Sequence, residues 1–304
     1  MTTFSNTHRK DTGTFIAAGI MALMAGSTVA SAQELPEAIT LTGVVRDFQE
    51  RSVSGGHTDF EWQPSGGFGQ YAYMVADELD AQGKPVYASN GRKVWSQWKD
   101  AQGRNVMPAR SYLPTPENGT TGSASTSDGG ALHTSADFAQ WFRDTPGKNI
   151  SSPLSITLKR SGDTNVYVFD DKQDATYQNL GGFFPINGQL YGNSAGNNKN
   201  FHFTYELDTT FTYQEGTGQV FTFTGDDDVW VFINGKCVID IGGVHSAVTQ
   251  TVDLDNIPWI NDGEECELKF FFAERHRTQS NFRIATSIIL RNAEIPSTDS
   301  IYDE

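Results

Sequence analysis

The chain has 304 residues, of which 22 are Lys or Arg and 37 are Asp or Glu, so its formal net charge is -15. Nucleic acid is therefore a poor partner, because a protein that binds a polyanion needs a basic face to neutralise phosphates. An anionic membrane surface is disfavoured for the same reason. Apolar residues at 37% and aromatic residues at 12% suffice for a packed core, and the 30 glycines favour strands and turns over helices. The composition predicts an all-β protein.

The first 32 residues have the pattern of a secretory signal peptide. A basic segment (8–10) precedes an apolar run of eleven residues (15–25) and a small-residue cleavage site (30–32). The apolar run is shorter than the roughly 20 residues that span a bilayer. We expect residues 1–32 to be removed and the product to be secreted, with one domain over 33–295, a polar acidic tail over 296–304, and no transmembrane segment.

The first part of the expected domain is irregular, and one short helix follows it. Short apolar pieces separated by turns predict irregular strands and long loops over 41–110, and the Pro, Gly, Ser and Thr of 115–130 predict a surface loop. Ser135 as N-cap, with apolar residues three and four positions apart from Phe138 onward, predicts a helix near 135–143.

Strands dominate the rest of the chain. They are predicted from runs of β-branched and aromatic residues between Gly-containing turns. The predicted strands are 154–159, 165–169, 201–207, 211–213, 220–224, 229–233, 238–241, 249–254, 268–273 and 282–290. Their number and spacing predict an antiparallel β-sandwich or barrel with long loops and one short helix.

The chain has two cysteines, and both lie in strand-like segments. Cys237 and Cys266 could form one disulfide, which an exported protein favours, or could be two buried free thiols. We expect the disulfide, which would stabilise the fold by about 3–4 kcal/mol in the chain-entropy description.

Three consecutive carboxylates precede a segment that is predicted to be a buried strand. Asp226, Asp227 and Asp228 repel one another, and this repulsion can be relieved by solvent, by a nearby Arg, or by a hard cation such as Ca²⁺. The run is therefore either a solvated turn or an ion site.

A second polar group follows the predicted strand 268–273. Strand alternation places Arg275 on the same face as Ala273, so its guanidinium is expected to leave a packed layer toward a carboxylate. We expect Arg275, His276 and His245 to brace the fold around the acidic run rather than to perform chemistry.

Longer motifs around these residues resemble a known family. The segments 225–245, 272–276 and 280–284, with earlier pieces at 43–48 and 183–188, are similar to the fibro-slime domain, a secreted module related to the PA14 domain. The resemblance covers roughly residues 41–289. It implies a PA14-like antiparallel β-sandwich or barrel on an extracellular protein without catalysis.

The resemblance also implies a binding site. In carbohydrate-binding members of the wider PA14 group, two adjacent Asp residues joined by a cis peptide hold a Ca²⁺ that coordinates sugar hydroxyls. Asp226 and Asp227 occupy these positions, Asp228 stands where Gly is usual, and Asn281 is the position that we match to the Asn of a second loop. The candidate ligand-binding residues are Asp228, Trp230, His245, Arg275 and Asn281.

Two classes of function follow. The first is a non-catalytic module that binds glycans or components of a cell surface or matrix, with Trp230 or Tyr191 available to stack on sugar rings; a purely structural matrix protein shares these features. The alternative is a secreted hydrolase with Asp228 and Glu274 as acid and base. Because the chain contains no Gly-x-Ser-x-Gly, His-Glu-x-x-His or zinc-ligand spacing, we expect binding rather than catalysis.

Overall fold

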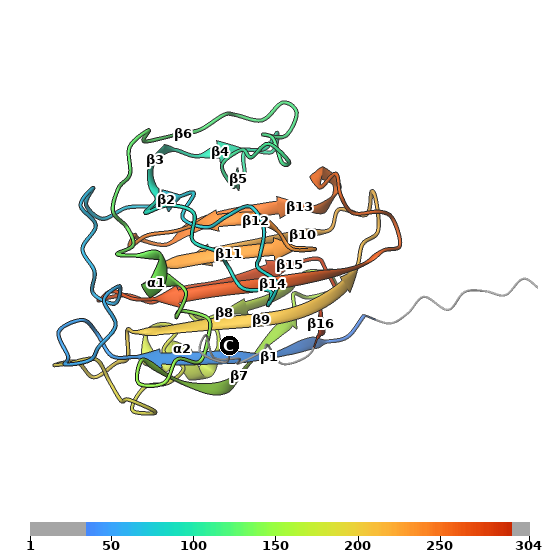
Figure 1. Ribbon diagram of the computed structural model, residues 1–304. Coiled ribbons are helices and arrows are strands. Elements are labelled where there is room, and N and C mark those ends of the chain that lie inside the picture. The colour runs from blue at the N-terminus through green and yellow to red at the C-terminus, as the bar shows by residue number, and fades with distance from the viewer. Residues whose placement is uncertain (1–34, 294–304) are drawn as a thin grey trace, which may run out of the picture. The chain divides into compact units, whose positions relative to one another are not determined.

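The computed structural model describes residues 35–293 (Figure 1). The predicted signal peptide and the acidic tail lie outside the described residues. Within residues 35–293 no helix has the length and apolar character needed to cross a membrane. The described part is almost entirely β-structure, as the composition and the strand pattern predict.

One large antiparallel sheet forms the body of the domain. Its strands follow the order β12-β11-β14-β9-β1-β7-β8-β15-β10-β13, and β16 also pairs with β9. The bounds are β1 (Ala38–Phe48), β7 (Asn149–Arg160), β8 (Tyr167–Asp170), β9 (Phe203–Thr212), β10 (Val220–Gly225), β11 (Asp228–Ile233), β12 (Lys236–Ile241), β13 (Val248–Asp253), β14 (Glu265–Glu274), β15 (Phe282–Thr286) and β16 (Arg291–Asn292).

The sheet folds over on itself around a core of phenylalanines. Phe272 of β14 and Phe282 of β15 belong to different halves of the strand order, yet their ring centroids are 5.1 Å apart. Phe223 of β10 lies 5.5 Å from Phe270 of β14. Such rings bury large areas at modest conformational cost, so they hold the two halves together.

A glutamine side chain joins the two end strands of the sheet. The Oε1 of Gln250 on β13 accepts a hydrogen bond from the backbone N–H of Asp240 on β12 (3.0 Å), and its Nε2 donates to the Asp240 carbonyl (3.1 Å). The side chain thus satisfies an edge that backbone pairing leaves open, and the sheet nearly closes into a barrel.

The prediction of irregular strands over 41–110 was wrong for its first part, because residues 41–48 belong to β1, which pairs with β7 along its whole length. The rest of this region and the predicted surface loop 115–130 contribute two small sheets. β2 (Tyr71–Ala72), β3 (Arg92–Ser96) and β6 (Ser123–Ala124) form one, and β4 (Trp98–Lys99) pairs with β5 (Asn105–Val106) in the other. Figure 1 shows these strands above the β12 and β13 side of the large sheet. The backbones of Tyr71 and Gly242 exchange hydrogen bonds of 2.6 and 2.8 Å, which ties β2 to the end of β12.

The predicted helix is shorter than expected and begins one residue earlier. α1 (Ser135–Phe138) is capped by Thr134, whose hydroxyl accepts from the N–H of Asp137 (3.0 Å), rather than by Ser135. The chain then continues in tight turns, but Trp141 remains fully buried. A second short helix, α2 (Ala175–Leu180), and a 3-10 turn over Leu254–Asn256 were not predicted.

Two strand predictions needed correction. The predicted strands 201–207 and 211–213 form the single strand β9, because its polar middle pairs with β14 and places Asp208 beside Lys269 in an ion pair. The predicted strand 282–290 ends at Thr286, whose hydroxyl accepts from the N–H of Ile288 in a turn.

The prediction of a disulfide was wrong. Cys237 and Cys266 are buried free thiols. They lie on β12 and β14, which flank β11 on opposite sides. Two strand spacings amount to about 9.5 Å, whereas bridged Cα atoms lie within about 7 Å, so the sheet order keeps the two thiols apart.

Candidate functional site

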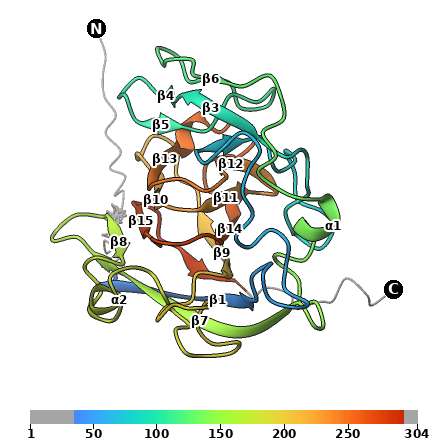
Figure 2. The ribbon, with the colours of Figure 1, turned by 90° about the vertical axis from the view of Figure 1, so that its left-hand side faces the viewer.

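Several strands end together at one end of the large sheet. Gly225 of β10 pairs with Phe282 of β15, and Asp228 of β11 pairs with Ala273 of β14. The loop 275–281 and the Asp226–Asp227 connection therefore meet there. The arrowheads of β1 and β14 point to this end in Figure 1, and Figure 2 views the domain from it.

Asp226 is held by Asn281. The backbone N–H of Asn281 donates to Oδ1 of Asp226 (2.7 Å) and its side-chain Nδ2 donates to Oδ2 (2.8 Å). The peptide bond between Asp226 and Asp227 is cis. The structure thus brings Asn281, our assignment for the second-loop Asn, into contact with Asp226, which lies 55 positions earlier in the chain.

Asp228 and Arg275 form a fully buried ion pair. The guanidinium Nε of Arg275 lies 2.5 Å from Oδ2 of Asp228, and both side chains have 0% exposure. Oδ1 of Asp228 also accepts from the N–H of Gly243 (2.6 Å). The expected bracing role of Arg275 is therefore confirmed. The expectation that Asp228 and Arg275 contact a ligand was wrong, because the pair leaves neither side chain open to solvent.

Two further buried carboxylates at this site lack a cation of their own. Oδ2 of Asp227 accepts only a 3.2 Å hydrogen bond from the N–H of Arg275, and both carboxylate oxygens of Glu274 are buried. Burial, with the nearby aspartates, raises the pKa of Asp227 and of Glu274 well above their ordinary values. Burial also raises the pKa of Asp226.

His245 lies near this carboxylate group. Its Nδ1 lies 2.8 Å from the carbonyl of Ser246, so Nδ1 carries the proton. Its Nε2 is buried and has no partner among the described residues. Burial lowers the pKa of His245, although Asp228 and Asp226 oppose this shift. His245 therefore lies near Asp226 and Asp228 with one ring nitrogen that has no partner among the described residues.

Trp230 does not contribute to a binding surface. Its side chain is fully buried, its ring packs edge-on against Phe138 at 5.6 Å, and its Nε1 donates to Asp240 (3.2 Å). The prediction that it stacks on a ligand was wrong, because both faces of β11 are covered. Tyr191 is partly buried, and its backbone N–H donates to Asp47.

One exposed aromatic residue was missed. Phe68 is 44% exposed, and its ring contacts the ring of His276 edge-on at 4.8 Å. The next residue, Gly69, donates its N–H to the carbonyl of Val244 (2.8 Å), directly before His245. The signal in the sequence is a single aromatic between glycines at positions 66, 67 and 69, which is typical of an exposed turn.

The geometry does not support Asp228 and Glu274 as an acid and base pair. Asp228 is locked to Arg275 and Glu274 is fully buried, so this pair has no access to a substrate. Among residues 35–293, three His or carboxylate ligand atoms come within 4.8 Å of one another at Glu50, Glu61 and His202 and not at the acidic loop. A cation at Asp226 and Asp227 would therefore take further ligands from amide oxygens, backbone oxygens or water, which Ca²⁺ accepts.

Comparison with known proteins finds a family model and several curated relatives that match this chain. Residues 186–299 match the PA14 domain. Protein psiD of Dictyostelium discoideum is 31% identical over 263 residues, which cover 84% of this chain and 42% of psiD. Protein psiQ of the same organism is 37% identical over 171 residues, which cover 52% of this chain and 16% of psiQ. The chain thus spans less than half the length of these curated relatives.

Among solved structures, the PA14 sugar-binding domain from RTX adhesin is 16% identical and covers 32% of this chain and 56% of that chain, with a TM-score of 0.23. A likeness of this size carries no argument about this chain. The sequence matches suffice by themselves: this chain is related to the PA14 domain and to the fibro-slime family.

Proposed function

We propose that this protein is a secreted, non-catalytic module that binds glycans or components of a cell surface or matrix through a Ca²⁺ ion at Asp226 and Asp227. The observation that carries the proposal is an excess of buried carboxyl groups over cations. Asp226, Asp227 and Glu274 adjoin a single guanidinium that is already paired with Asp228. Secretion rests on the N-terminal sequence pattern.

The residues present fit a calcium ion. Buried carboxylates with raised pKa values bear a desolvation cost that a bound cation removes, and oxygen donors are what Ca²⁺ requires. Asp226, Asp227 and the amide oxygen of Asn281 would hold the ion, and the ion would supply coordination positions for ligand hydroxyls. His245 and Asn281, which are partly exposed at the rim, would contact such a ligand.

A calcium titration tests the ion. Calorimetry and thermal melting of the chelator-treated protein should reveal one Ca²⁺ site, and at 100 times its dissociation constant the ion should stabilise the fold by about 2.7 kcal/mol. Asp227→Asn should abolish this gain. The matched control is Asp163→Asn, since Asp163 is exposed in a turn outside the site. An unchanged melting temperature in excess calcium would exclude the ion site.

A glycan array tests the ligand class separately. The protein should bind glycans on the array in the presence of calcium. This binding should be lost when a chelator is added, and the Asp227→Asn variant should not bind. Calcium binding without retention on any glycan would refute the carbohydrate ligand and leave the ion site in place. Retention that survives chelation would refute the calcium-bridged mechanism.

A further inference from the structure

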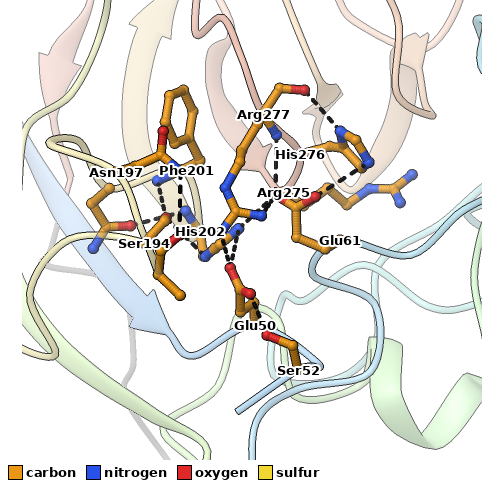
Figure 3. A network of polar contacts seen from close by, with 12 residues as sticks. Glu50, Ser52, Glu61, Ser194, Asn197, Phe201, His202, Arg275, His276 and Arg277 are labelled. Atoms are coloured by element: carbon orange, nitrogen blue, oxygen red, sulfur yellow. Dashed lines mark hydrogen bonds and ion pairs between the residues drawn. The ribbon is translucent and has the colours of Figure 1, made fainter.

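A second cluster of ligating side chains lies beside the acidic loop but shares none of its residues. Glu50 follows β1, Glu61 lies in the next loop, and His202 immediately precedes β9. One ligand atom of each lies within 4.8 Å of the other two. Figure 3 shows these three side chains converging with that of Arg277.

The spacing of these atoms suits a small divalent ion. The Nε2 of His202 lies 3.0 Å from Oε1 of Glu61 and 3.8 Å from Oε2 of Glu50. Two ligands about 2.1 Å from a tetrahedral ion are about 3.4 Å apart, and the two distances bracket this value. One imidazole nitrogen with two carboxylates suits Zn²⁺ or a similar transition metal, whereas Ca²⁺ prefers oxygen ligands alone.

Outer hydrogen bonds already orient two of the three ligands, His202 and Glu50. The Nδ1 of His202 lies 3.0 Å from Oγ of Ser194, which itself accepts from the N–H of Phe201 (2.9 Å). Ser52 donates its hydroxyl to Oε1 of Glu50. Supporting contacts of this kind fix the ring and carboxylate orientations around protein-bound metals.

A protein cation contacts the same two oxygens. Nη1 of Arg277 lies 2.9 Å from Oε1 of Glu61, and its Nη2 pairs with Oε2 of Glu50. The ion pair is incomplete, because Nε of Arg277 is buried without an acceptor among the described residues. The side chain is 22% exposed, so it can turn toward solvent without unfolding the core.

We propose that Glu50, Glu61 and His202 bind a divalent transition-metal ion such as Zn²⁺, in competition with the guanidinium of Arg277. In the metal-free protein the Nε2 proton of His202 faces Glu61. When the ion takes the Nε2 lone pair, this proton is lost from Nε2 and Nδ1 carries the ring proton, which Ser194 Oγ can accept. Arg277 keeps its charge and moves to solvent. The inference goes beyond the proposed calcium and glycan function and does not depend on it.

The test is calorimetric titration of Zn²⁺ into the protein without a histidine tag, in buffer with saturating calcium. We expect one site, loss of binding in His202→Gln, and at least about tenfold tighter binding in Arg277→Gln, because the competing charge is gone. The matched control is Arg283→Gln, since Arg283 pairs at 3.4 Å with Asp170 outside the cluster. Its affinity should equal that of the unchanged protein.

A measurement on the unchanged protein covers the case in which His202→Gln fails to fold. Co²⁺ should give the visible ligand-field absorption of a tetrahedral site, and Zn²⁺ should displace it. Absence of any Zn²⁺ or Co²⁺ binding by the unchanged protein would overturn the proposal. Equal affinity in Arg277→Gln, or binding that persists in a folded His202→Gln variant, would overturn it as well.

Discussion

Removal of Arg275 should destabilise the fold strongly, and the structure sets the magnitude. The guanidinium contacts both oxygens of Asp228, at 2.5 Å through Nε and 3.4 Å through Nη2, with both side chains fully buried. Arg275→Ala leaves the Asp228 carboxylate with the N–H of Gly243 as its remaining donor and removes the positive charge beside Asp227. Breaking a buried pair in this way costs about 3–5 kcal/mol.

The assay is urea unfolding in chelator, so that calcium does not mask the missing charge. The double variant Arg275→Ala with Asp228→Ala should be less destabilised than the sum of the two single variants, because it leaves no unpaired charge at that position. The cost of Arg275→Ala should also be smaller near pH 5 than near pH 8, because Arg275 opposes the rise that burial causes in the pKa of Asp227, and without Arg275 ionised Asp227 is destabilised further.

Two results would refute this reasoning. A loss below about 1 kcal/mol in Arg275→Ala is the value of a surface contact and would mean that the pair is solvated. Strict additivity in the double variant would mean that Arg275 acts through its packing over the Trp141 ring, 5.5 Å from the guanidinium carbon, rather than through its charge.

Three further predictions follow from burial. Trp230→Ala should lower the free energy of unfolding by about 3–5 kcal/mol in urea, without weakening ligand retention by the folded protein. Trp95 is 66% exposed, so Trp95→Ala should lower it by less than about 0.5 kcal/mol. Equal losses in the two variants would contradict this prediction. Burial raises the pKa of Cys266 to about 11, and Cys237 is fully buried. A thiol reagent should therefore label both cysteines only after the protein is unfolded. A melting temperature that falls in reductant would instead indicate a disulfide. Burial raises the pKa of Asp47 to about 7 and of Asp59 to about 6 and lowers that of His57 to about 4. Between about pH 5 and 6 the two carboxyls hold protons mainly in the folded state and His57 holds one mainly in the unfolded state, so the folded state binds about one extra proton. These groups should therefore lower the free energy of unfolding of the calcium-free protein by about 1.4 kcal/mol per pH unit as pH rises, and a urea series showing a flat or rising trend would contradict this.

The local sequence was sufficient for much of the fold and for part of the site. Alternating and aromatic runs located most strands of the large sheet, because strand pairing requires this periodicity wherever the chain lies. The motif around Asp226 and Asp227 identified the acidic loop. The motif did not specify the Asn of the second loop; Asn281 was our assignment, and its side chain donates to Asp226.

Other features depended on which strands became neighbours. The sequence left Trp230 available to stack on a sugar ring, but Phe138 packs against it over β11 and buries it. The sequence allows a disulfide between the two cysteines, but the strand order places β11 between the strands that carry them.

What the sequence by itself determined is the set of local elements and the motif of the acidic loop, since spacing within one segment specifies them. Only the tertiary structure decided the charge balance of the site. Arg275 belongs to Asp228 and leaves Asp227 and Glu274 without a cation, while Glu50, Glu61 and His202 meet across about 150 positions of chain. Burial and charge pairing act between side chains that are distant in sequence, so no local pattern specifies them.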